Sequence, residues 1–257
     1  MSNWKNVTGL DLAILRENRK ALHQAVQLVG AFPRNMLPHD PTDGTASLVW
    51  NSSIKSLESL PFVNDDGAFK VGLSFTVFEL YIELEGDQKS ACCLSGMSVN
   101  EGLVWLKQNL AELGIKADHI SLDLPYEIEN YDYSEALVVD KQALQEYADL
   151  YQNTQNSLRI VLTNWKEAFD IRCWPHHFDL ATLIPLKTDS EGEILKSIGV
   201  GLSPGDEGVE EPYVYVNIWP EVDLNILEKH SLPIGQWNKA GWSGAVLTYA
   251  QMLDSKN

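Results

Sequence analysis

The chain has 257 residues, of which 44% are hydrophobic and 9% aromatic, so it carries enough apolar surface to offset the entropy lost on folding. Its 19 Lys and Arg residues stand against 36 Asp and Glu residues, and the formal charge of −17 repels nucleic-acid phosphates and anionic lipid headgroups. We therefore expect neither nucleic acid nor a membrane as a partner.

The sequence predicts a cytoplasmic protein. No apolar run approaches the roughly 20 residues that span a bilayer, and residues 1–20 lack the apolar core of a signal peptide. The three cysteines, Cys92, Cys93 and Cys173, have no CxxC spacing, so we expect reduced thiols. A chain of this length forms one large domain or two small ones, and we expect residues 1–257 to fold as a single globular unit.

The first predicted element is an amphipathic helix over residues 10–30. Apolar residues from Leu15 to Val29 recur at helical spacing, and Gly30 and Pro33 predict its end.

Short strands follow at residues 46–51, 53–60, 68–75, 78–85 and 90–94. In residues 78–85 apolar and acidic side chains alternate, which is typical of a half-buried antiparallel strand. The strand before it alternates in the opposite phase, so we expect a tight turn or bulge near Thr76.

The second helix carries a clear start signal. Ser98 and Glu101 match a capping box, an apolar stripe runs from Val99 to Leu113, and Gly114 predicts the end.

A third helix is predicted over residues 140–166, with Asp140 as its N-cap. Further strands are predicted at residues 169–174, 178–186, 196–203 and 212–219, and a final helix at 242–253.

These elements predict an α+β fold in which about four helices flank antiparallel sheets. Residues 10–115 and 140–254 repeat the order helix, strands, helix, which indicates two pseudo-repeats.

The segment Trp174-Pro175-His176-His177-Phe178-Asp179 gathers the side chains most suited to catalysis. On an extended strand His177 and Asp179 share one side and His176 takes the other. His177 and Asp179 could then form a general base with its orienting acid, or bind a divalent metal ion with a third ligand. The candidates for that third ligand are His39, Asp206 and Glu211. Alternatively, these groups only fix the entry to the strand through hydrogen bonds.

Polar aromatic side chains are the predicted ligand-binding residues. Tyr213 and Tyr215 alternate with aliphatic residues on one strand, and Trp237 follows in a loop. Together with Trp174 and His176 they could line a small-molecule pocket, and they would equally suit a protein interface or the edge of the core.

Residues 201–205, GLSPG, match the G-x-S-x-G motif of serine hydrolases. The residue after the serine must donate its N–H to the oxyanion hole, and Pro204 has no N–H. We therefore interpret this motif as a turn.

The runs WPHHFDLATLI, IGVGLSPGD, EPYVYVNIWPE, LPIGQW and GWSGAVL resemble a family of uncharacterised bacterial proteins, related to a domain of unknown function. The resemblance is most specific over residues 170–250 and looser before them. It implies a shared fold, and it implies no reaction and no set of metal ligands.

Two functions fit these observations. The first is a small-molecule-binding protein or enzyme with a site at His177 and Asp179, with or without a divalent metal ion. The second is a non-catalytic structural or protein-interaction module.

Overall fold

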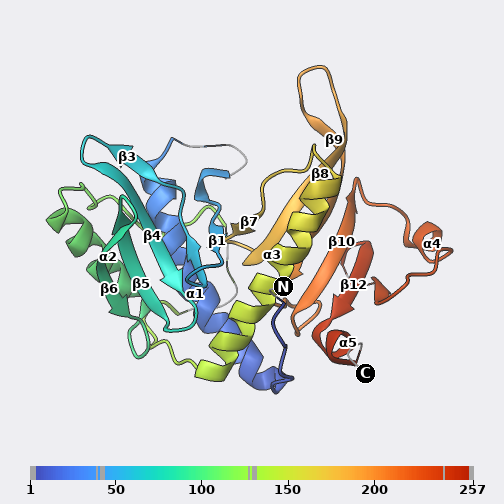
Figure 1. Ribbon diagram of the computed structural model, residues 1–257, viewed down its shortest axis with the longest axis horizontal. Helices are drawn as coiled ribbons and strands as arrows, with labels where there is room; N and C mark the ends of the chain where they lie inside the picture. Colours follow the sequence, from blue (N-terminus) through green and yellow to red (C-terminus); the bar gives the residue numbers. More distant parts are fainter. Residues whose placement is uncertain are drawn as a thin grey trace. The chain divides into compact units, whose positions relative to one another are not determined.

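The computed structural model describes residues 4–38, 40, 44–126, 128, 132–239 and 241–254. Within them, five helices and two antiparallel sheets confirm the predicted α+β class (Figure 1). The chain divides into two compact units. Unit 1 comprises residues 1–12, 149–172 and 179–257, and unit 2 comprises residues 13–148 and 173–178.

Unit 2 contains a six-stranded antiparallel sheet with the strand order β1-β2-β4-β5-β6, in which β3 pairs with β4. The strands are β1 (Val49–Asn51), β2 (Ser56–Glu58), β3 (Phe62–Asn64), β4 (Gly67–Ser74), β5 (Glu79–Leu84) and β6 (Asp87–Cys93). A short 3-10 helix, η1 (Gly44–Ala46), precedes them. The predicted turn near Thr76 is confirmed, since residues 75–78 turn the chain from β4 into β5.

Two helices, α1 (Leu12–Met36) and α2 (Val99–Glu112), complete the core of unit 2. They lie on one side of its sheet (Figure 1). The core-facing side chains of β4 and β5 alternate with polar ones and are fully buried, among them Phe69, Val71 and Ile82. The predicted capping box of α2 is confirmed, because Ser98 Oγ accepts from Glu101 N and Glu101 Oε2 accepts from Ser98 N.

The predicted end of the first helix is wrong, because α1 continues through Gly30 and Pro33 to Met36. Gly30 serves close packing and does not stop the helix, since a Cβ on it would lie 3.0 Å from Cγ of Pro175. Pro33 lies in the last turn, where its fixed φ is compatible with the helix.

Unit 1 is built on a second antiparallel sheet, which contains the strand order β11-β12-β10-β9-β8. Its strands are β8 (Asp179–Thr188), β9 (Ile194–Ser203), β10 (Tyr213–Trp219), β11 (Gln236–Asn238) and β12 (Gly244–Thr248). Two short helices, α4 (Leu224–Leu227) and α5 (Tyr249–Asp254), also belong to it. The boundary between the units falls within α3 (Lys141–Asn164) and within β7 (Arg172–Trp174).

The ends of α3 agree with the sequence, and Asp140 caps it by accepting from the N–H groups of Gln142 and Ala143. The predicted last helix is mostly wrong. Residues 244–248 form β12, which pairs with β10 on one edge and β11 on the other, and only Tyr249–Asp254 is helical. Strand pairing on both edges outweighs the weak helical spacing of the large side chains. Among the described residues, no helix has the length and hydropathy to cross a membrane.

Candidate functional site

The two histidines of the WPHHFD segment lie in a turn. Residues 175–178 form this turn, and β8 begins only at Asp179. The N–H groups of His177 and Phe178 both donate to the carbonyl of Trp174, at 3.1 and 2.6 Å, and Phe178 has a φ of 55°. The predicted extended backbone is therefore wrong for residues 176–178 and correct from Asp179 onward. The alternation of side chains along a strand does not apply to His177, which is exposed and belongs to unit 2, whereas Asp179 belongs to unit 1.

Within unit 2 the turn is fixed to α1 through Pro175. Its carbonyl oxygen lies 2.8 Å from His23 Nε2 and accepts a hydrogen bond from Gln27 Nε2, also at 2.8 Å. Because a carbonyl only accepts, His23 carries its proton on Nε2. The His23 ring stacks on Phe178 at 5.4 Å between centroids, and burial lowers the pKa of His23 to about 4. His23 is thus a neutral hydrogen-bond donor that supports the turn.

The two predicted ligand-binding residues of this segment remain close to each other. The rings of Trp174 and His176 meet edge to face with their centroids 6.2 Å apart, and the centroid of the Tyr126 ring lies 5.2 Å from that of His176. Both predicted residues are half-buried.

In unit 1, Asp179 is joined to the predicted tyrosines. Tyr215 Oη donates to Asp179 Oδ2 at 2.5 Å, and Tyr213 Oη donates to Asp206. The two tyrosine rings and Trp242 lie within 6.5 Å of one another. Burial raises the pKa of Tyr213, and Asp179 is only 8% exposed. In this cluster of phenols and carboxylates Asp179 and Tyr213 are buried, Tyr215 is half-buried and Asp206 is exposed.

The other candidates have contacts of their own. Trp237 lines a pocket of about 810 Å³ beside Glu228 and Lys239, and its Nε1 donates to the carbonyl of His230. Glu211 accepts from the N–H of Ala250. His39 lies outside the described residues. In the described part of the chain, no group of three or more His, Cys, Asp or Glu side chains could hold a metal ion.

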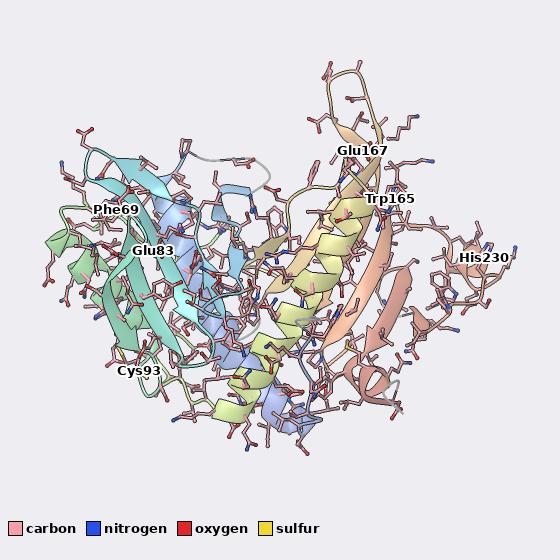
Figure 2. The ribbon with its side chains drawn as sticks, viewed as in Figure 1. Phe69, Glu83, Cys93, Trp165, Glu167 and His230 are labelled. Atoms are coloured by element: carbon pink, nitrogen blue, oxygen red, sulfur yellow. The ribbon has the colours of Figure 1, made fainter. Side chains whose placement is uncertain are left out.

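Sequence reasoning missed a buried carboxylate on the outer face of the unit 2 sheet. Glu58, 5% exposed, accepts from Asn51 Nδ2 at 2.6 Å and from Tyr81 Oη at 3.0 Å. Lys70 bridges it to Glu83, with N to O distances of 3.4 and 3.2 Å (Figure 2 labels Glu83). The alternation in residues 78–85 signals this face, since it places Tyr81 beside the glutamates. Because its groups satisfy one another, we interpret this network as structural.

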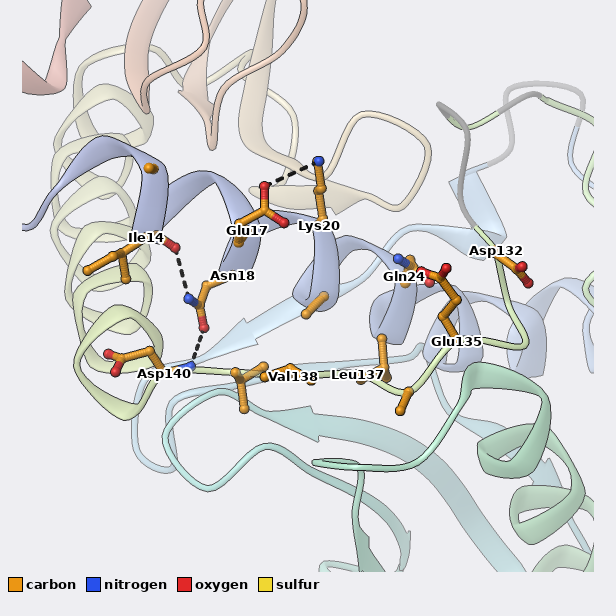
Figure 3. Close-up of a pocket in the computed structure, with 14 residues that line it drawn as sticks. Ile14, Glu17, Asn18, Lys20, Gln24, Asp132, Glu135, Leu137, Val138 and Asp140 are labelled. Atoms are coloured by element: carbon orange, nitrogen blue, oxygen red, sulfur yellow. Dashed lines mark hydrogen bonds and ion pairs between the residues drawn. The ribbon is translucent and has the colours of Figure 1, made fainter.

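A larger pocket, of about 960 Å³, lies between α1 and residues 132–140, which begin with a turn at 132–135 and then run on to α3 (Figure 3). We call it the α1 groove. Its lining residues are Ala13, Ile14, Glu17, Asn18, Lys20, Ala21, Gln24, Asp132, Glu135, Ala136, Leu137, Val138, Val139 and Asp140. All of them belong to unit 2.

The wall opposite α1 is held in place by backbone hydrogen bonds. Leu137 donates its N–H to the carbonyl of Met97 and accepts from the N–H of Gly96, both at 2.8 Å. Its side chain is buried. At the end of the wall, the N–H of Asp140 donates to Oδ1 of Asn18 in α1, 2.6 Å away (Figure 3). The groove therefore has a defined shape before any ligand binds.

The groove combines exposed apolar side chains with an acidic rim. Ile14 is 43% exposed and Val138 77%, although both are large and apolar. The charged lining residues are Glu17, Asp132, Glu135, Asp140 and a single cation, Lys20. Lys20 is paired with Glu17 at 3.3 Å. In the sequence, the apolar run of residues 136–139 between two acidic residues was the signal that could have indicated this groove.

A family model matches the greater part of this chain. The model, described as a family of unknown function (DUF5996), covers residues 7–183. This confirms the resemblance to a domain of unknown function. The match includes the α1 groove and the WPHHFD segment, whereas the other stretches that carry the resemblance lie beyond it. No curated protein and no solved structure matches the chain.

Proposed function

We propose that this chain, which belongs to the DUF5996 family of unknown function, is a protein-interaction module that binds a partner polypeptide in the α1 groove. The exposure of Ile14 and Val138 beside a preformed groove of about 960 Å³ carries this proposal. Contiguous apolar surface rimmed by polar groups is typical of an interaction site, because its exposure to water is otherwise unfavourable.

The openness of the groove, and not its size, favours a polypeptide over a small molecule. Pockets for small ligands enclose about 300 to 1,000 Å³ and bury most of the ligand surface. The α1 groove lies at the upper end of this range, and Val138 on its wall remains mostly exposed. A chain that runs along the groove would cover this residue.

The second candidate is the small-molecule-binding protein or enzyme expected from His177 and Asp179. The hydrogen bond of Tyr215 to Asp179 supports it, because it adds a polar aromatic group to the predicted carboxylate. A cytoplasmic location is also a proposal, and the free thiols of all three cysteines support it.

Selection of peptides from a random library displayed on phage tests the interaction proposal. The affinity of the selected peptides is then measured for the variant Ile14→Gln/Val138→Gln, which removes the apolar lining of the groove without adding charge. The matched control, Val63→Gln/Val104→Gln, changes two apolar residues of unit 2 that are 68% and 54% exposed and lie outside the groove.

We expect selected peptides to bind the groove variant at least tenfold more weakly than the control. Equal binding to both variants, or a library that yields no peptide, would overturn the proposal.

A further inference from the structure

In the wall of the α1 groove, residues 136–138 have one paired edge, where Ala136 forms a β-bridge with Ser98, and one open edge. Leu137 directs its N–H and C=O toward Met97 and Gly96. In extended backbone, successive residues direct these groups to opposite edges, so those of Ala136 and Val138 face away from Met97. Among the described residues, neither of these two has a hydrogen-bond partner for its N–H or C=O.

The direction of the open edge follows from Asp140. Asp140 is two residues beyond Val138 in the segment that runs beside α1 (Figure 3), and its N–H reaches Asn18 of α1. The N–H groups of Ala136 and Val138 therefore face the same side, toward the groove. Asn18 closes this edge at one end, which leaves residues 136–138 open.

We propose that the partner binds by strand addition: an extended peptide pairs with the backbone of Ala136 and Val138 and lies in the α1 groove. This inference rests on the proposed function and adds the binding mode. An unpaired edge is a template for a further strand, because the incoming backbone supplies the missing donors and acceptors.

The charges at the groove specify a basic peptide. Asp132, Glu135 and Asp140 are exposed at the rim, and Lys20 is already paired with Glu17. The whole chain carries a formal charge of −17. A second copy of the chain would bring the same sign of charge, whereas a peptide with Lys or Arg at its ends complements the rim.

Fluorescence anisotropy with synthetic peptides tests both parts of the inference. The probe is a labelled KTVTVTK peptide, and ETVTVTE is its acidic match. Two isomers of the probe are methylated on backbone nitrogens. One carries the methyl groups on the residues whose N–H groups would face the open edge, and the other carries them on the residues in between.

We expect the basic peptide to bind at least tenfold more tightly than the acidic one at low salt. One N-methylated isomer should lose about 30-fold in affinity, because two backbone hydrogen bonds are removed, and the other should bind like the parent peptide. The Ile14→Gln/Val138→Gln variant should weaken binding, and the Val63→Gln/Val104→Gln control should not.

The possible failures separate the inference from the proposed function. If both isomers bind like the parent while the groove variant still loses affinity, strand addition is wrong and the groove remains the binding site. If the basic peptide does not bind, the inference is wrong. The phage selection then tests independently whether the groove binds a polypeptide. Binding that the groove variant leaves unchanged contradicts both.

Discussion

The ring of Tyr81 on β5 lies directly over Gly72, its register partner on β4, and leaves no room for a Cβ on Gly72. From this position the phenol reaches β2, where its oxygen lies 2.8 Å from Ser56 Oγ and donates to Glu58 at 3.0 Å. Burial and the nearby carboxylates raise the pKa of Tyr81, so the phenol stays protonated as the donor. Gly72 is thus the residue that allows a buried carboxylate to be satisfied.

Gly72→Ala should destabilise the protein by about 1 to 3 kcal/mol, because the added methyl group forces the Tyr81 ring off the sheet. Urea denaturation measures the change in the free energy of unfolding. In a double-mutant cycle with Tyr81→Ala the two losses should be far from additive, since the clash disappears with the ring. Additive losses would show that the ring and the glycine act independently.

The neutral His23 predicts a stability that depends on pH. Its pKa is lowered from 6.5 to about 4 in the folded state, so the unfolded chain binds more protons between these values. Stability from this group is therefore fully present above pH 6.5 and is lost as the pH falls toward 4. The shift corresponds to a loss on the order of 3 kcal/mol.

Denaturation curves of the wild type and His23→Gln at pH 7 and pH 4 measure this effect. The glutamine keeps a donor for the carbonyl of Pro175 and cannot take up a proton. The wild type should lose more stability on acidification than the variant does. Equal losses in the two proteins would assign the acid sensitivity to other groups.

The sequence correctly predicted those features that depend only on a few neighbouring residues. The capping box at Ser98, the N-cap at Asp140 and the turn near Thr76 depend on a few adjacent residues, and all three are present in the structure. The turn at residues 175–178 was missed because it carries no Gly or Asn, and its left-handed residue is Phe178. Phe78, at the end of the turn before β5, has a similar φ of 52°.

The α1 groove could not be predicted because its two walls are far apart in the sequence. One wall comes from α1 and the other from residues 132–140, and their alignment depends on the contact of Asn18 with Asp140. Hydrophobic periodicity reports which face of an element is buried, but not which distant segment lies beside it. The predicted pair of His177 and Asp179 relied on a strand, and the backbone turns instead.

The capping box of α2 provides a local test of stability. Ser98→Ala removes the oxygen that accepts from the N–H of Glu101, and we expect a loss of about 1 kcal/mol. Ser98→Asp should retain most of the stability, because a carboxylate also caps the helix. Thermal unfolding followed by circular dichroism measures both, with Ser95→Ala, an exposed serine nearby, as the control. If Ser98→Ala unfolds like this control, the cap contributes nothing.

Tyr215→Phe distinguishes a structural role of Asp179 from a role in ligand binding. The variant removes the donor 2.5 Å from a carboxylate that is only 8% exposed, so we expect a loss of about 1 to 3 kcal/mol in the free energy of unfolding. Urea denaturation of the variant and of His177→Ala measures it, and the exposed His177 should change stability by less than about 0.5 kcal/mol. Unchanged stability in Tyr215→Phe would mean that the fold does not need this hydrogen bond. The phenol and the carboxylate would then be free to act on a ligand, which is the role that the sequence predicted for them.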